Sequence, residues 1–283
     1  MFTHWLRCCD PAVMKPSATR LDEAIAQSIL QLLGFGASAE LADASTRAGA
    51  NFRRRLFAPY ELGGYGIMSC RLAADAAYVA SWANCGQLIE SAIPITDQSL
   101  ETIDLLHLQP LADALERLRM AAAKSVPISV PDCVANGDSK LQQLIYGSLQ
   151  EVEMQKLKAD LAGDLSGLAQ LESAGYGHAF TWLGASPALR SMRMNDSDFR
   201  LASALRLRLP LHYLLPDLPA VPCKCLRCDK DMDIYGDHAF RCLIHYVSRR
   251  HTALKKAFFH EAFSSQRNPA VAAQCSAELE SMS

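Results

Sequence analysis

The 283-residue sequence lacks the features that mark membrane-spanning and secreted proteins. It contains no run of about 20 apolar residues, which is the length that a helix needs to cross a bilayer. Its first ten residues lack the basic stretch followed by an apolar stretch that forms a signal peptide. We therefore expect an intracellular protein, nuclear or cytoplasmic, with no membrane partner. In such a reducing setting, clustered cysteines are more often metal ligands than disulfides.

Motifs of several enzyme classes are also missing. The chain has no phosphate-binding P-loop, no Gly-x-Ser-x-Gly elbow, no His-Glu-x-x-His and no Tyr-x-Asp-Asp box. One stretch, Pro131-Asp132 followed by Asp138-Ser139-Lys140, imitates the metal site of restriction-type nucleases. The carboxylates of such sites come from adjacent strands, whereas a loop separates the two aspartates here. We therefore interpret Asp138 as a helix N-cap and expect no catalytic residues in this chain.

The chain has little net charge, with 28 Lys and Arg against 30 Asp and Glu. This balance gives no global signal for nucleic-acid binding. The charge is unevenly distributed, however, because residues 188–263 hold 13 Lys and Arg against 8 Asp and Glu. The remaining residues hold 15 Lys and Arg against 22 Asp and Glu, so the rest of the chain is acidic.

Half of the residues are hydrophobic and one fifth are charged, which is typical of a globular protein. The apolar residues recur at three- and four-residue spacing, which predicts amphipathic helices. Pro11 and Pro16 are expected to act as breakers before the first one. Helices are predicted over 20–33, 38–50, 69–92, 97–123 with a break at Pro110, 139–161, a short segment ending at 173, 198–209 and 247–263. Gly34 and Gly36 are expected to end the first of these helices, Ser69 to cap the third, and Asp196 or Ser197 to cap the helix over 198–209. Tyr78 and Trp82, one turn apart, are interpreted as core residues because alanines surround them. No run of alternating β-branched residues predicts a strand, so the fold class is mainly α.

Three consecutive arginines, Arg53 to Arg55, precede a glycine-rich stretch that contains Gly63, Gly64 and Gly66. Arginines can hold a phosphate backbone, because each contact releases counterions. A solvated basic turn explains the same residues, and both interpretations stay open. The glycines permit a backbone turn but do not match the dinucleotide-binding fingerprint, because the third spaced glycine and a preceding apolar strand are absent.

The densest group of chemically active residues lies near the C-terminus. Cys225 and Cys228 are separated by two residues, and His238 and Cys242 by three. Thiolate and imidazole are the ligands that tetrahedral Zn²⁺ prefers. The spacing predicts a Cys₃His site for Zn²⁺, with Cys223 as an alternative ligand in place of Cys228. Chance clustering is the alternative interpretation, although such spacings are fairly specific.

Several stretches, taken in order, resemble a known family. These are Leu62 to Ser69, Ala77 to Trp82, Phe199 to Arg208, the cysteine cluster with its Gly236-Asp237-His238, and Arg250-His251. Together they resemble the C-terminal part of non-LTR retrotransposon proteins that carry a restriction-like endonuclease. The most specific pieces are the glycine-rich turn at Gly63 to Ile67 and the cysteine cluster, whereas residues 95–175 match only in helical character.

The resemblance implies a helical thumb and linker followed by a Cys-Cys-His-Cys knuckle. It implies that residues 1–124 are thumb-like, 125–222 a helical linker, 223–263 the knuckle with the start of an endonuclease-like helix, and 264–283 a tail. The family's polymerase aspartates would lie before Met1 and its nuclease carboxylates after Glu278. We therefore expect a fragment that handles nucleic acid without either active site.

The resemblance also suggests that basic residues contact the phosphates of RNA or DNA. The predicted contacts are Arg53, Arg54, Arg55, Arg206, Arg208, Lys224, Arg227, Arg249, Arg250, Lys255 and Lys256. The alternative is a zinc-stabilised helical module whose partner is another protein, or a transposon remnant without a function. The balanced charge favours this alternative modestly.

Overall fold

The computed structural model describes residues 2–92, 109–121, 140–177, 179–184, 193–214, 224–225 and 228–242. The chain divides into two compact units, residues 1–215 and 216–283, which are treated separately below. Within the described residues there are helices and one isolated β-bridge, but no strand. The predicted mainly α fold is therefore confirmed. Of the predicted helices, residues 97–108, 122–123, 139 and 247–263 lie outside the described residues.

The first unit begins with two helices, α1 (Phe2–Cys8) and α2 (Pro11–Leu33). The prediction that Pro11 and Pro16 break the chain was therefore wrong. Pro11 occupies the first turn of α2, where its missing N–H would have no intrahelical partner, and Asp10 caps the helix by accepting from the Ala12 N–H. Pro16 lies inside the helix on an exposed side, where the carbonyl left without a donor faces water. As predicted, the helix ends at Gly34, with φ of 87°.

The segment expected to be one helix is broken into α3 (Ala39–Ala42) and α4 (Arg47–Phe57). Side chains of the residues between the two helices bond to backbone groups that a continuous helix would need for its own hydrogen bonds. Asp43 accepts from the Ser45 N–H, and the Thr46 hydroxyl donates to the Glu40 and Asp43 carbonyls. Thr46 also caps α4 by accepting from the Gly49 N–H. The three arginines consequently lie on a helix and not in a turn.

The glycine-rich stretch folds back against α4 after a short 3₁₀ helix, η1 (Tyr60–Leu62). The Tyr65 N–H donates to the Arg55 carbonyl, and the Ile67 N–H to the Leu56 carbonyl. Gly63 has φ of 82°, which glycine adopts without strain. A Cβ on Gly64 would lie 2.2 Å from the Ala58 carbonyl oxygen. The turn therefore requires glycine for both conformation and space.

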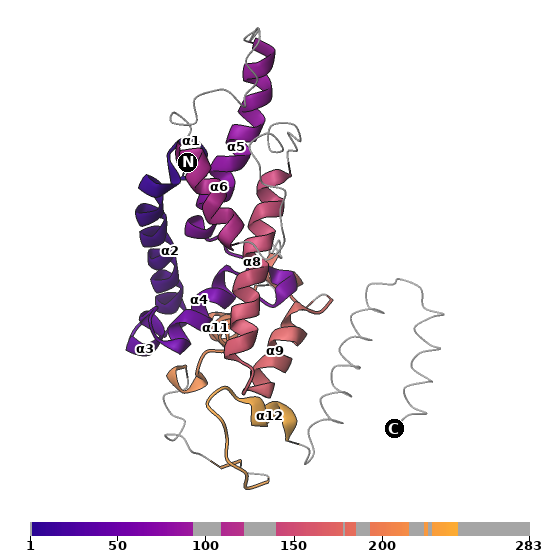
Figure 1. Cartoon of the computed structure of the whole chain (residues 1–283). Helices are drawn as coiled ribbons and strands as arrows, with labels where there is room; N and C mark the ends of the chain where they lie inside the picture. Colours follow the sequence, from indigo (N-terminus) through magenta and orange to yellow (C-terminus); the bar gives the residue numbers. More distant parts are fainter. Residues whose placement is uncertain are drawn as a thin grey trace, which may run out of the picture. The chain divides into compact units, whose positions relative to one another are not determined.

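The long helix α5 (Cys70–Ala92) forms the centre of the first unit, in contact with α1, α2, α6 (Gln109–Ala121) and α8 (Leu141–Asp160) (Figure 1). Ser69 caps it as predicted, since its Oγ accepts from the Leu72 N–H. Tyr78 is buried and meets Trp82 edge to face, which supports their interpretation as core residues. Because α5, α6 and α8 share one apolar core, the regions expected to divide near residue 124 pack as one unit.

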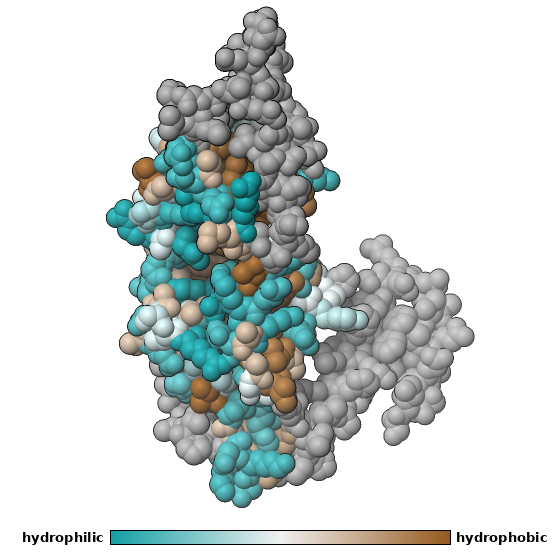
Figure 2. All heavy atoms as spheres, in the orientation of Figure 1, coloured by the Kyte–Doolittle hydropathy of each residue, from teal (hydrophilic) through white to brown (hydrophobic). Residues whose placement is uncertain are grey.

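The remaining helices of this unit are α9 (Leu165–Gly175), α10 (Thr181–Gly184), α11 (Asp196–Leu207) and the 3₁₀ turn η4 (Leu211–Tyr213). Asn195 caps α11, not Asp196 or Ser197 as expected, because its side chain accepts from the Asp198 N–H. Ala204 and Leu207 of α11 join Leu30 and Phe52 in a second apolar core. In Figure 2 the described face of this unit is mostly hydrophilic with scattered hydrophobic residues. No helix among the described residues is both long and apolar enough to cross a membrane.

Candidate metal centre

In the second unit, a short hairpin-like turn carries the first two predicted ligands. Lys224 and Asp231 form an antiparallel bridge. Inside it, the Cys225 N–H donates to the Lys230 carbonyl, and the Asp229 N–H donates back to the Cys225 carbonyl. Asp229 adopts a left-handed conformation with φ of 56°, which aspartate tolerates better than most residues. This turn holds Cys225 and Cys228 on one side of a tight loop.

The short helix α12 (Asp237–Arg241) carries His238, and the fourth predicted ligand, Cys242, follows directly as its C-cap residue. The Cys242 N–H donates to the His238 carbonyl at 2.8 Å, so the two residues are one helical turn apart. Gly236 precedes the helix with φ of 78° and provides no capping side chain. Instead, the carboxylate of Asp233 accepts from the backbone N–H groups of Tyr235, Asp237 and His238.

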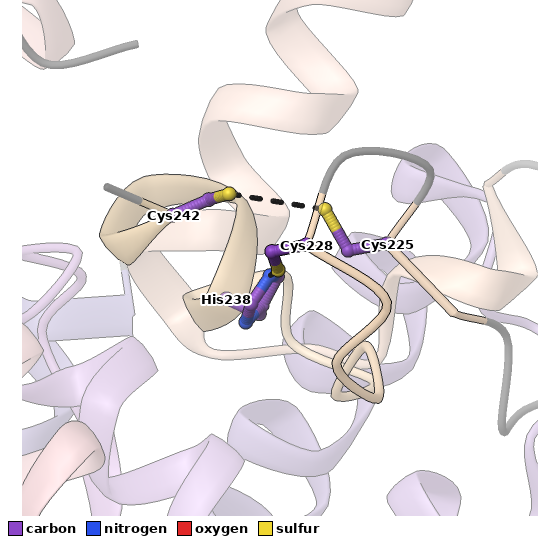
Figure 3. A group of neighbouring side chains, drawn as sticks. All are labelled: Cys225, Cys228, His238 and Cys242. Carbon is purple, nitrogen blue, oxygen red and sulfur yellow. Dashed lines mark hydrogen bonds between the residues drawn. The ribbon is translucent and has the colours of Figure 1, made fainter. Parts of the chain in front are cut away.

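The four predicted ligands converge on one point (Figure 3). One ligand atom from each of Cys225, Cys228, His238 and Cys242 lies within 4.8 Å of all the others. The Cys225 and Cys242 Sγ atoms are 3.8 Å apart, and the Cys228 Sγ lies 3.1 Å from the His238 Nε2. Two thiolates bound tetrahedrally to Zn²⁺, each at about 2.3 Å, would lie about 3.8 Å apart. The distance between the Cys225 and Cys242 Sγ atoms therefore matches a tetrahedral site, and the four residues could together hold a metal ion.

The pKa values of two side chains reflect this crowding. The Lys230 N–H lowers the pKa of Cys228, but burial and the adjacent thiols of Cys225 and Cys242 raise it more, so the net pKa lies above its ordinary value. A bound cation would reverse this, because it stabilises thiolates. At Asp233, burial raises the pKa, yet the three backbone donors outweigh burial and hold the pKa below its ordinary value.

The structure brings Cys228 into the cluster together with Cys225. Cys223, the predicted alternative ligand, lies outside the described residues, as do Arg227, Arg249, Arg250, Lys255 and Lys256. Among the predicted phosphate contacts of this unit, only Lys224 is described. It is exposed, and its Nζ lies 3.5 Å from Asp229. Exposed pairs of this kind are weak, so Lys224 remains accessible to another anion.

The predicted phosphate contacts of α4 are already engaged within the first unit. Arg53 donates from Nε to Glu23 at 2.9 Å and from its terminal nitrogens to the Leu41 and Ala42 carbonyls. Arg54 joins α4 to α8 through Glu153 and Asp160. Both arginines line a cavity of about 320 Å³ whose walls also carry acidic side chains, including Glu23 and Glu153. A phosphate would have to compete with these carboxylates.

Arg55 and Arg206 are buried, with 2% and 5% of their surface exposed. Arg206 donates to the backbone carbonyls of Tyr60, Gly64 and Ala174, and Arg55 donates to Gln170 and the Gly167 carbonyl. Burial therefore argues against the expected phosphate contacts at these two arginines, because their guanidinium groups face the protein interior.

Arg208 pairs with Asp164, and its side chain is 8% exposed. It therefore belongs with the structural arginines of the first unit. Sequence reasoning also overlooked Asp233. The available signal was an aspartate three residues before Gly236, since aspartate commonly accepts from backbone N–H groups just after it.

Comparison with known proteins identifies no relative: no family model, no curated protein and no solved structure matches the chain.

Proposed function

We propose that residues 223–256 form a zinc-stabilised knuckle that binds RNA or DNA through phosphate contacts. The observation that supports this function best is the convergence of four metal ligands within a segment rich in cations. Residues 223–256 contain eight Lys and Arg against four Asp. A metal ion that fixes the turn and α12 would also fix the direction of cations attached to them.

Zinc is the metal that suits the ligand set, because three thiolates and one imidazole are soft and borderline donors. Four protein ligands complete a tetrahedral coordination sphere and leave no position for a reacting water. The proposed metal is therefore structural, and the proposed function is binding without polymerase or nuclease activity. The origin from a retrotransposon protein remains part of this proposal and is supported by the order of the sequence stretches given above.

A second candidate function is a zinc-stabilised module that binds another protein. One specific observation favours it: five arginines predicted to contact phosphates form hydrogen bonds or ion pairs within the first unit instead. They are Arg53, Arg54, Arg55, Arg206 and Arg208. With these five arginines occupied, the first unit supplies fewer cations for a phosphate backbone than the sequence suggested.

Titration of the purified zinc-loaded chain with labelled single-stranded RNA, single-stranded DNA and duplex DNA at low salt tests the proposal. We expect modest affinity that falls steeply with salt. Replacing Arg249 and Arg250 with Ala should weaken binding to all sequences about equally and lower the log–log salt slope by about 1 for each lost contact.

A matched control replaces Arg20 and Arg47, two exposed cations of α2 and α4, with Ala. This variant loses the same charge and should bind as the unmodified chain does. No binding at low salt, or an equal effect of both double variants, would leave the protein-binding module as the better account. Primer extension or strand cleavage above background, abolished by a point change in this chain, would contradict the non-catalytic function.

A further inference from the structure

The loop that joins the two halves of the metal centre contains a side chain with an unusual number of local bonds. The Asp233 carboxylate accepts from the Tyr235 N–H at 2.9 Å and the Asp237 N–H at 3.0 Å through Oδ1, and from the His238 N–H at 2.7 Å through Oδ2. A single carboxylate thus satisfies the first two N–H groups of α12, those of Asp237 and His238, and the N–H of Tyr235 in the turn before it.

These bonds matter because the residue at the N-cap position of α12 is Gly236, whose left-handed conformation turns the chain into the helix but offers no side-chain acceptor. Helices leave their first N–H groups without partners, and a helix of five residues cannot compensate through length. Without Asp233, the Asp237 and His238 N–H groups would lose these side-chain bonds, and the turn that fixes His238 relative to Cys242 would be held less firmly.

We propose that Asp233 is the positioning residue of the metal centre, holding His238 Nε2 and Cys242 Sγ in the arrangement that binds the ion. It acts through the backbone of α12 and is not a ligand, since the group of side chains that could hold the ion consists of Cys225, Cys228, His238 and Cys242. The inference rests on the proposed metal centre. It resembles the general role of outer-shell hydrogen bonds, which orient metal ligands and whose loss weakens metal binding about 10- to 100-fold.

The neighbouring acidic residue Asp231 provides a matched control. It lies two residues away and is exposed, so Asp231→Asn removes the same charge near the ion without removing the cap. Comparing this variant with Asp233→Asn and Asp233→Ala separates two effects: the attraction of the metal ion by a nearby negative charge, and the positioning of the ligands by the bonds to α12. Asp233→Ser keeps a short oxygen acceptor of the kind that caps helices and should restore part of the affinity.

The experiment is competition for Zn²⁺ between the full chain and a chromophoric chelator, together with the visible spectrum of the Co²⁺-substituted protein. We expect Asp233→Ala to bind Zn²⁺ about 10- to 100-fold more weakly and to change the Co²⁺ d–d bands. We expect Asp231→Asn to stay within about threefold of the unmodified chain.

Equal affinities for Asp233→Ala and the unmodified chain, or equal losses in the Asp233→Ala and Asp231→Asn variants, would overturn the positioning role. Failure of the unmodified chain to bind Zn²⁺ is a different result, which would overturn the metal centre itself. Circular dichroism of each variant shows whether the helices of the first unit are intact, so that a general folding defect is not mistaken for weak metal binding.

Discussion

The two units are stabilised by different means. The first is held by apolar clusters that include Phe52, Leu30 and Ile145, each no more than 2% exposed, and by arginines that join distant segments. In the second unit, burial is described for residues 224–225, 228–239 and 242, and among these only Gly236 and Cys242 are buried. So few buried residues do not offset the entropy of ordering this segment through apolar contacts. The comparison indicates that the first unit folds on its own core and leads us to predict that the knuckle needs a metal ion to fold.

Removal of the metal should therefore have the largest effect, and only in the second unit. We expect one Zn²⁺ per chain and its loss in a Cys225→Ser, Cys242→Ser variant, as measured by elemental analysis. Chelation should make residues 224–242 rapidly cleavable by protease and leave the helical circular dichroism of the first unit nearly unchanged, because metal binding and local folding are one equilibrium in such sites.

The matched control is a Cys8→Ser, Cys9→Ser variant, whose cysteines belong to the first unit and should leave the zinc content unchanged. Cys223→Ser should keep the metal and Cys228→Ser should lose it; the reverse result would exchange the two ligands. Cooperative unfolding of both units on chelation would contradict the proposed difference between them.

A change at Arg206 should affect the first unit and leave the second unchanged. The buried guanidinium of Arg206 donates to three backbone carbonyls of the first unit. Burial lowers the pKa of Arg206, and the nearby Tyr65 and Tyr60 oppose this shift. Arg206→Met removes these three bonds, although the Tyr60 carbonyl still accepts from the Gly63 N–H. The loss should destabilise the first unit by about 3 kcal/mol without altering zinc affinity. Urea unfolding followed by circular dichroism measures the change.

Arg200→Met is the control for Arg206→Met, because Arg200 lies on the same helix and is exposed. Exposed substitutions of this kind usually alter stability by less than about 0.5 kcal/mol. Equal effects of the two variants would mean that the bonds to the carbonyls contribute little, and the burial of Arg206 would then need another explanation.

The smallest expected effect is a pH dependence of the first unit that involves Glu23. The hydrogen bond from Arg53 lowers the pKa of Glu23 below its ordinary value, against an opposing contribution from burial. The unfolded chain therefore binds this proton more readily, so the stabilisation is present above the ordinary pKa and lost as pH falls through the folded-state pKa. Since Glu23 is 40% exposed, we expect less than about 1 kcal/mol.

Unfolding measured between pH 6 and about pH 3 should show a shallower decline in Glu23→Gln than in the unmodified chain. Asp196→Asn, a change at an exposed carboxylate of α11, serves as the reference. Parallel pH profiles for the unmodified chain and Glu23→Gln would show that the pair with Arg53 does not contribute.

The features that the sequence predicted correctly depend on residues close together in the chain. The spacing of Cys225, Cys228, His238 and Cys242 predicted a cluster that the structure confirms. The ends of helices at Gly34 and Ser69 were also predicted, because caps involve bonds within a few residues. Pro11 was misread because a proline is tolerated in the first turn of a helix, and the position of that turn was set by Asp10.

Only the tertiary structure decided what the arginines do. Arg206 reaches the carbonyl of Gly64, 142 residues away, and Arg54 reaches Asp160, 106 residues away. Seen as sequence, Arg53 to Arg55 form a run of free positive charge that suits a phosphate backbone. In the folded protein, partners from distant segments surround these arginines. How well a charged side chain can bind a phosphate depends on the partners it already has and on its access to water. The sequence by itself determined most of the helices and the cysteine–histidine cluster, because local spacing governs both, whereas the use of each charge depended on how the helices pack.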